Sequence, residues 1–263
     1  MCAGGADGGA DSGHGTGGRA VSGYGAGREV VGDFERSETI GRVLSPGDRL
    51  FLNSSLWPGF VDAHRRVIDL AREAGVAQVV TVSVRGAEPG ALLGGGMHGV
   101  VDDHLRASGL PYAILQPVGY LQNLLTKVRN GRFFGSYGPI EVGYIDVRDV
   151  AGVAAALLTR PVGESATHVL TGPEAYTHAE IAAALTAVLG RQVEYVDLPV
   201  PEMAAHLERQ GMPAPFGQAL AALMAEVGDG HWSSTTTTVE DITGHPPRSL
   251  TTFLADHATA FTP

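Results

Sequence analysis

Cysteine and lysine are almost absent from this 263-residue chain: Cys2 is the single cysteine, and Lys127 is the single lysine beside seventeen arginines. One cysteine can form neither an internal disulfide nor a multi-cysteine zinc or iron–sulfur site, as is typical of proteins of the reducing cytoplasm. This single lysine stands in neither a Tyr-x-x-x-Lys pair nor a Walker motif, so both are absent. We expect Lys127 itself to lie on a solvated helix face.

Other absences narrow the function further. The chain has no His-Glu-x-x-His and no Gly-x-Ser-x-Gly, so the common zinc-protease and serine-hydrolase signatures are missing. No stretch approaches the roughly 18 apolar residues of a membrane helix, and no basic start precedes an apolar run. A net charge of −10 argues against binding to nucleic acid or to an anionic membrane. We therefore expect a cytoplasmic protein with a small-molecule substrate, and a homodimer is compatible with the sequence.

Strand and helix patterns alternate from Arg28 onward. Short apolar runs predict strands over 28–34, 49–55, 76–84 and 110–117, and amphipathic patterns predict helices over 60–75 and 97–109. Continuous apolar strands that alternate with helices indicate a parallel sheet covered on both faces. The sequence therefore predicts an α/β fold.

The pattern loosens beyond Pro117. We expect helices over 119–131, 148–161, 177–191, 199–211 and 215–228, strands over 141–147 and 192–199, and a loop or short edge strand at 234–238. Such mainly helical material typically covers the carboxyl ends of the strands, where open α/β sheets bind their ligands. His178, His206, His231, His245 and His257 have no ligand-like spacing, so we interpret them as surface or capping residues.

Residues 1–28 contain eleven glycines and almost no bulky apolar side chain, so we interpret them as a low-complexity tail. The tail includes Gly13-x-Gly15-x-x-Gly18, the spacing of a dinucleotide-binding loop. No apolar strand precedes Gly13 and no apolar helix face follows Gly18. We therefore attribute this spacing to glycine-rich composition.

Six segments taken in order resemble one known family. They are VVGDF, VIDLAREAGVAQVVTVSVRGA, MHGVVDDHLRASGLPYAILQPVGYLQNLL, YIDVRDVAGVAAALLT, HVLTGPEAYTHAEIAAALTAVLGR and GHPPRSLTTFLADHATAF. They resemble the NmrA-like, atypical short-chain dehydrogenase/reductase family, which includes NAD(P)H:quinone reductase-like and dye-reducing members. The resemblance implies a Rossmann-like doubly wound parallel sheet that binds NADP or NAD. It would make 29–263 one NAD(P)-binding domain, with a Rossmann core over 29–118 and a smaller, mostly helical substrate-covering part over 119–263.

The resemblance breaks at the N-terminus. In the family a glycine-rich turn for the pyrophosphate follows an N-terminal apolar strand, whereas a strand–helix–strand unit of roughly 30 residues does not fit in this tail. The missing strands would lie mid-sheet, between the strands at 28–34 and 49–55. Either these two strands pair directly in a compressed sheet, or a shifted reading frame has replaced the natural N-terminus.

By resemblance, several residues border the cofactor. Asp33 would lie near the adenine, although it could equally be a turn residue that caps a helix starting near Ser37. A further six residues would border the nicotinamide half, the first three at a strand end that could also be a plain loop: Asn53, Ser54, Ser55, Pro117, Val118 and Gly119.

Ser83 occupies the place of the superfamily's active-site serine, where its hydroxyl could donate a hydrogen bond to a substrate carbonyl. His98 could donate a proton near neutrality if its pKa is ordinary, or it could orient substrate or serve the structure alone. Many relatives have arginine where this chain has Gln116, which removes a fixed charge.

The substrate side would be lined by Tyr120, Asn123 and Tyr144, of which Tyr144 could stack on a flat acceptor. We interpret Asp149 mainly as a structural residue at a helix N-terminus.

The resemblance favours an NAD(P)H-dependent oxidoreductase that transfers hydride to a quinone, a dye or a conjugated ketone. Without a tyrosine–lysine pair, an acceptor that readily takes hydride is favoured over a simple ketone. The alternatives are a non-catalytic NAD(P)-binding redox sensor and a degenerate chain that binds no nucleotide.

Overall fold

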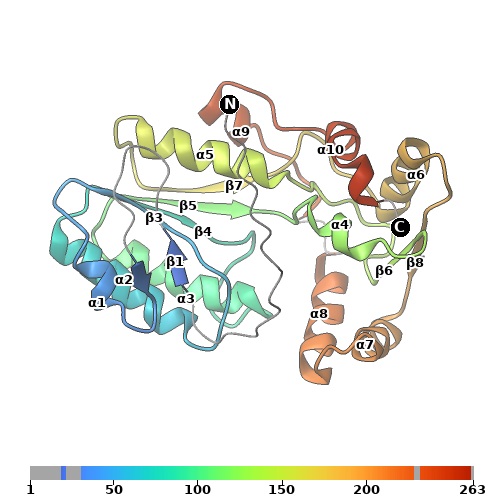
Figure 1. Ribbon diagram of the computed structural model, residues 1–263, viewed down its shortest axis with the longest axis horizontal. Helices are drawn as coiled ribbons and strands as arrows, with labels where there is room; N and C mark the ends of the chain where they lie inside the picture. The colour runs from blue at the N-terminus through green and yellow to red at the C-terminus, as the bar shows by residue number, and fades with distance from the viewer. Residues whose placement is uncertain (1–18, 22–30, 228–231, 262–263) are drawn as a thin grey trace, which may run out of the picture.

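A computed structural model describes residues 19–21, 31–227 and 232–261 of the chain. Its centre is a four-stranded parallel sheet of order β3-β4-β5-β7 (Figure 1). The strands are β3 (Arg49–Leu52), β4 (Gln78–Val82), β5 (Tyr112–Pro117) and β7 (Ala166–Leu170). Val79, Val80, Ile114 and Leu115 are fully buried, as expected for a sheet covered on both faces.

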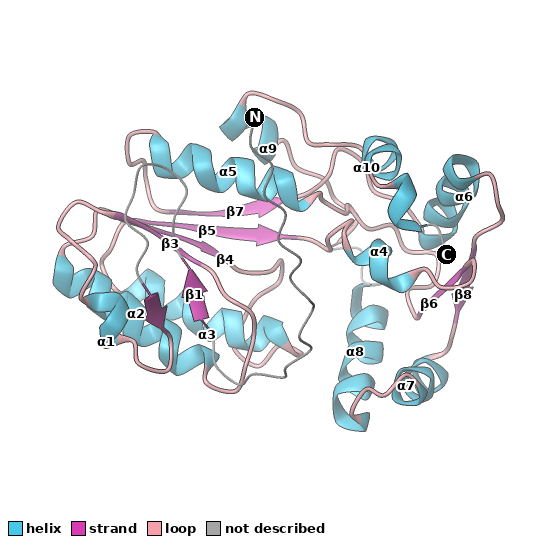
Figure 2. Ribbon diagram, in the orientation of Figure 1, coloured by secondary structure: helices cyan, strands magenta, loops and turns pink. Residues whose placement is uncertain are grey.

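Helices cover both faces of this sheet (Figure 2). On one face lie α1 (Glu38–Gly41), α2 (Phe60–Ala74) and α3 (Gly94–Ala107), and on the other lie α5 (Val147–Thr159) and α9 (Thr238–Thr243). Gly75 ends α2 with φ +72°, the left-handed conformation that glycine adopts most readily, as the sequence indicated. The predicted α/β, doubly wound architecture is confirmed, and we call this part the sheet lobe.

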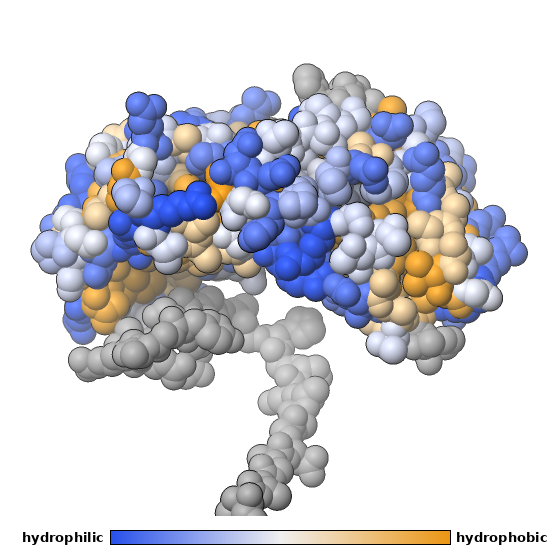
Figure 3. Space-filling view, turned by 90° about the horizontal axis from the view of Figure 1, so that it is seen from above, coloured by the Kyte–Doolittle hydropathy of each residue, from blue (hydrophilic) through white to orange (hydrophobic). Residues whose placement is uncertain are grey.

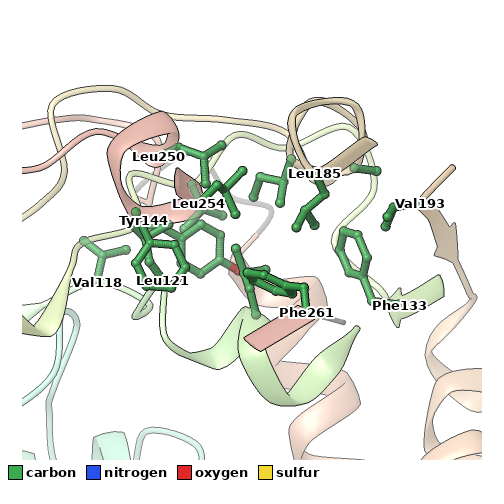
Figure 4. Packing of buried hydrophobic residues seen from close by; sticks show 14 of the residues in the cluster. Val118, Leu121, Phe133, Tyr144, Leu185, Val193, Leu250, Leu254 and Phe261 are labelled. Carbon is green, nitrogen blue, oxygen red and sulfur yellow. The ribbon is translucent and has the colours of Figure 1, made fainter. Parts of the chain in front are cut away.

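The elements after β5, apart from α5, β7 and α9, form a C-terminal lobe. It contains the parallel pair β6 (Arg132–Gly135) and β8 (Glu194–Asp197), with α4 (Asn123–Lys127), α6 (His178–Leu189), α7 (Val200–Arg209), α8 (Ala214–Glu226), α10 (Leu250–Asp256) and a 3-10 helix (Ala258–Phe261). Its core runs from Val118 and Tyr144 at one end to Phe133 and Val193 at the other (Figure 4). Hydrophilic side chains gather where the two lobes meet (Figure 3).

The first two strands do not extend the main sheet. β1 (Arg19–Val21) pairs antiparallel with β2 (Val31–Asp33), and among the described residues β3 and β7 are the two edge strands of the main sheet. Direct pairing of the strands at 28–34 and 49–55 in a compressed sheet is therefore wrong. Instead, Phe34 follows β2 into the core beneath α2 and lies with Trp57 and His64.

Three further expectations need correction or remain open. The helix expected over 119–131 is only α4, because Val128 turns to extended backbone and Gly131, at φ +72°, leads into β6, which the sequence did not predict. The segment 141–147 joins no strand ladder of the described residues: it makes isolated bridges, Val142 with Tyr176 and Ile145 with Tyr120, and Val147 begins α5. Gly13, Gly15, Gly18 and most of the tail lie outside the described residues, and the division of the chain at 28 and 118 stays a prediction.

No described helix has the length and apolar character needed to cross a membrane.

Candidate active site

The carboxyl ends of β3, β4 and β5 lie along one edge of the sheet and point toward the C-terminal lobe (Figure 2). Ser54 follows β3, Ser83 follows β4, and Pro117 ends β5. The parallel register alone brings these positions together, because neighbouring parallel strands end at the same edge. The structure thus groups the predicted nicotinamide-side residues with the predicted active-site serine.

Ser83 is held at this edge by main-chain and side-chain bonds. Its amide donates to the Leu115 carbonyl at 2.7 Å, and its Oγ lies 2.7 Å from Oδ2 of Asp102, on α3. Gln116 Nε2 donates to the same carboxyl oxygen at 3.4 Å. Asp102 is only 1% exposed, and burial raises its pKa above the usual range.

The backbone at 117–119 is fixed by its neighbours but keeps free polar groups. The Val118 amide donates to Leu170 at 3.1 Å, and the Gly119 carbonyl accepts from Ile145 at 3.0 Å. No partner is found among the described residues for the Gly119 amide or the Val118 carbonyl. The two groups belong to one trans peptide unit and point in opposite directions, so one of them at a time can face a nicotinamide carboxamide.

Only glycine fits at position 119. A Cβ there would lie 2.4 Å from Cε1 of Tyr144, and Tyr144 is itself only 6% exposed. The predicted stacking of Tyr144 on a substrate would require neighbouring side chains to move. The Tyr144 ring therefore shapes the backbone of the site from behind.

A buried histidine pairs with Tyr144. His178 Nε2 lies 2.9 Å from Tyr144 Oη, and Tyr137 stacks on the imidazole at 3.8 Å between ring centroids. Burial, together with the charge of Lys127, lowers the pKa of His178 to about 3. The interpretation of His178 as a surface or capping residue is wrong, because α6 turns its first residue into the C-terminal core. Lys127 also differs from expectation, since it is half-buried with Nζ 3.4 Å from Tyr137 Oη.

His98, on α3, makes a T-shaped ring contact with Phe60 at 5.0 Å between centroids, and burial lowers the pKa of His98 to about 4. The ordinary pKa assumed for His98 is therefore wrong, and the ring is neutral near pH 7. His64, which belongs to no motif of the sequence, lies beside it with Nε2 3.3 Å from Ser54 Oγ and a pKa also lowered to about 4 by burial. Its place on the apolar face of α2 was the signal available in the sequence.

The other predicted residues lie near the surface or serve the structure. Asp33 accepts from the Glu35 amide at 2.9 Å and from Arg36 Nε at 3.0 Å, so it stabilises its own turn and does not cap α1. Asp149 is buried and accepts from the Arg248 amide at 2.8 Å, which confirms a structural role. Asn53, Ser55 and Asn123 are exposed, whereas Tyr120 is half-buried and burial raises its pKa to about 12.

Comparisons with known proteins identify the family. The model of a family described as NAD(P)H-binding matches residues 25–161. The chain belongs to this NAD(P)H-binding family. It is 32% identical to the NAD(P)H azoreductase of Xenophilus azovorans over 88% of this chain and 83% of that protein. It is also 31% identical to the agroclavine dehydrogenase of Claviceps fusiformis over 86% and 82% of the two chains.

A solved structure agrees with this membership. The NADPH-dependent quinone oxidoreductase of Escherichia coli, solved in complex with NADPH, matches with a TM-score of 0.78 at 27% identity, over 86% of this chain and 82% of that one. The resemblance drawn from the sequence is thereby confirmed, as are the reductase-like α/β fold and NAD(P)H as the cofactor of the family.

The described residues fit one half of an NAD(P)H molecule. Either the amide or the carbonyl of the Val118–Gly119 peptide can bind the nicotinamide carboxamide, and Ser54 and Ser83 follow neighbouring strands at the same sheet edge. For the pyrophosphate, the family's glycine-rich turn follows the first strand of the sheet, and no strand of the main sheet precedes β3 among the described residues; the glycines at 86, 90 and 94–96 lie later, between β4 and the start of α3. The fit is thus to the nicotinamide side.

Proposed function

We propose that this chain is an NAD(P)H-dependent oxidoreductase that transfers hydride to a quinone, a dye or a conjugated ketone. The observation that carries the proposal is the shared edge of β4 and β5, where Ser83 is hydrogen-bonded to Leu115 and the peptide between Val118 and Gly119 keeps an amide and a carbonyl with no partner among the described residues. The names of an azoreductase and a quinone oxidoreductase among the similar proteins support this substrate class. When bound, the cofactor supplies the hydride.

In this proposal Val118 and Gly119 orient the nicotinamide through their main-chain groups, and Pro117 fixes that backbone. Asn53, Ser54 and Ser55 border the same half of the cofactor from β3. Asp33 stands further out, toward the adenine. The protein thereby contributes orientation, which lowers the entropic part of the barrier.

On the substrate side, Ser83 donates a hydrogen bond to the oxygen on which charge develops. His98 is neutral and orients the substrate as an N–H donor, because burial lowers its pKa to about 4. Tyr120 and Asn123 complete the wall of the substrate side, and Tyr144 supports the backbone at Gly119 from behind. We place the enzyme in the cytoplasm, because a chain with a single cysteine forms no internal disulfide and therefore needs no oxidising compartment.

Nucleotide binding and turnover test the proposal in sequence. We expect NADPH or NADH to raise the melting temperature of the full chain, because a ligand at 100 times its Kd stabilises the folded state by about 2.7 kcal/mol. A panel of quinones and azo dyes should then oxidise the bound cofactor. Ser83→Ala should keep the binding and lose most of the turnover.

The outcomes separate the alternatives. No binding of either nucleotide to the folded chain would overturn the proposal. Binding without turnover of any acceptor would favour a redox sensor, for which the two oxidation states must bind with different affinity.

A further inference from the structure

We propose that Asp102 is a protonated acid that acts through Ser83 and supplies the proton that the reduction consumes. The inference rests on the function proposed above and assigns a residue that lies behind the site. Such an acid would take the place of the Tyr-x-x-x-Lys pair, which this sequence lacks. The contact between Tyr137 and Lys127 belongs to the cluster around His178 in the C-terminal lobe.

The contacts of Asp102 are unusual for a carboxyl group in a protein interior. One carboxyl oxygen, Oδ2, makes both of the hydrogen bonds of this side chain, with Ser83 Oγ at 2.7 Å and with Gln116 Nε2 at 3.4 Å. The other, Oδ1, is buried and has no hydrogen-bond partner among the described residues. Buried carboxylates are normally paired with a cation or fully hydrogen-bonded, because an uncompensated charge is costly in the interior.

No described cation forms an ion pair with this carboxyl, and Arg106 stabilises its charge only from a distance. The strands packed against it offer neutral Ser83 from β4 and neutral Gln116 from β5. On its own helix, Arg106 forms an ion pair with Asp103 at 2.9 Å, and His98 is neutral near pH 7. Across the contact with α2, His104 pairs with Asp69 at 3.0 Å.

Protonation of Asp102 accounts both for the missing ion-pair partner and for the buried Oδ1 that has no hydrogen bond among the described residues. A proton on Oδ2 removes the buried charge and donates to Ser83 Oγ across the 2.7 Å contact. Oδ1 then becomes a carbonyl oxygen, whose missing partner costs less than a missing partner of a charge. The Ser83 hydroxyl hydrogen, no longer needed for Asp102, is free to point at a substrate oxygen.

The proton steps balance with the hydride step. As the acceptor gains hydride, negative charge develops on its oxygen or nitrogen, and the Oγ–H bond of Ser83 breaks to form the new bond to that atom. The Oδ2–H bond of Asp102 breaks in turn and restores the Ser83 hydroxyl. Asp102 is left as a carboxylate and takes a proton from water before the next turnover. The acceptor has then gained one hydride and one proton.

Infrared spectroscopy tests the protonation without any substrate or cofactor. At neutral pH, wild-type protein should show the carbonyl stretch of a protonated carboxylic acid, and Asp102→Asn should lose it. Asp103→Asn, on the exposed side of the same helix, is the matched control and should keep it. Gln116→Arg should also abolish the band, because a guanidinium beside Oδ2 stabilises the carboxylate. Absence of the band in wild-type protein would overturn the proposal.

Kinetics test the relay. Asp102→Asn should lower kcat about a hundredfold with little change in KM, the usual size of a general-acid contribution. In wild-type enzyme kcat should fall as rising pH ionises Asp102, and this limb should be absent from the Asp102→Asn profile. An infrared band with unchanged kcat in Asp102→Asn would overturn the relay and leave the reductase function standing. Loss of nucleotide binding in wild-type protein would instead overturn the function, whatever the infrared result.

Discussion

Three histidines that differ in surroundings share one property, a pKa well below 6.5. The pKa is about 4 for His64 and His98 and about 3 for His178, in each case mainly because of burial. The unfolded chain therefore binds more protons than the folded chain between about pH 6.5 and pH 4, and stability falls as the pH falls through that window. Each histidine should cost about 2 kcal/mol between pH 7 and pH 5.

Urea unfolding at these two pH values checks this expectation. His64→Phe, which places another ring in the aromatic cluster with Phe34 and Phe60, should reduce the acid-dependent loss by about 2 kcal/mol. His245→Asn, at an exposed position, should leave the loss unchanged. An equal loss in wild-type protein and His64→Phe would contradict the assignment.

A second residue-scale prediction concerns the backbone of the site. Gly119→Ala should destabilise the chain by about 1–3 kcal/mol, because its Cβ would lie 2.4 Å from the buried Tyr144 ring. Gly163→Ala is the matched control, since nothing lies within 4 Å of a Cβ there. Thermal unfolding of the two variants measures the difference, and equal melting temperatures would show that the ring yields.

At the scale of elements, α6 depends on its first turn. Thr177 Oγ1 accepts from the Glu180 amide at 3.1 Å, and Glu180 Oε2 accepts from the Thr177 amide at 2.8 Å, a capping box. Thr177→Ala should cost about 1 kcal/mol, whereas Thr177→Ser keeps the hydroxyl and should cost little. Chemical denaturation compares them. A full loss in the serine variant would assign the effect to the lost methyl group.

Elements with a clear period were predictable, and those fixed by distant contacts were not. The sequence located α2 because its apolar stripe and Gly75 are local signals. The sequence predicted a strand at 141–147. This segment instead makes single bridges to Tyr176 and Tyr120, which lie elsewhere in the chain, and never forms a ladder. It missed β6, whose partner β8 lies about sixty residues further on and offers no local signal.

The candidate site shows the same division. Ser83 could be selected because strand ends carry ligand sites in parallel sheets. Asp102 could not be selected, because its role depends on the absence of a described cation at the ends of β4 and β5, which only the packing reveals. The pKa values of His98 and His178 were equally out of reach, because burial sets them and burial follows from packing.

At the scale of the whole molecule, the chain passes between the lobes several times. It leaves the sheet lobe after β5, returns for α5 and β7, leaves for α6, and returns again for α9 (Figure 1). Arg85, just beyond β4, also donates to the Ser234 carbonyl at 2.9 Å, 149 positions along the chain. We therefore expect the lobes to unfold as one cooperative unit.

The two tryptophans make this testable, because Trp57 packs in the sheet lobe and Trp232 against the C-terminal core. Trp57→Phe and Trp232→Phe each leave one fluorescent reporter. Urea transitions followed in the two variants should coincide after correction for any stability change that circular dichroism detects. Separate midpoints for fluorescence and circular dichroism within one variant would show that the lobes unfold independently.

The half-buried Lys127 lies on the segment by which the chain first leaves the sheet lobe, after β5. A lysine-specific protease can cut this chain only there, after residue 127. The first piece would hold β3, β4 and β5, whereas the second would hold β7, α5 and α9, which complete the same sheet. Such a cut would not release two separate bodies. It would yield a split protein whose halves each lack part of one core and can recover it only from the other.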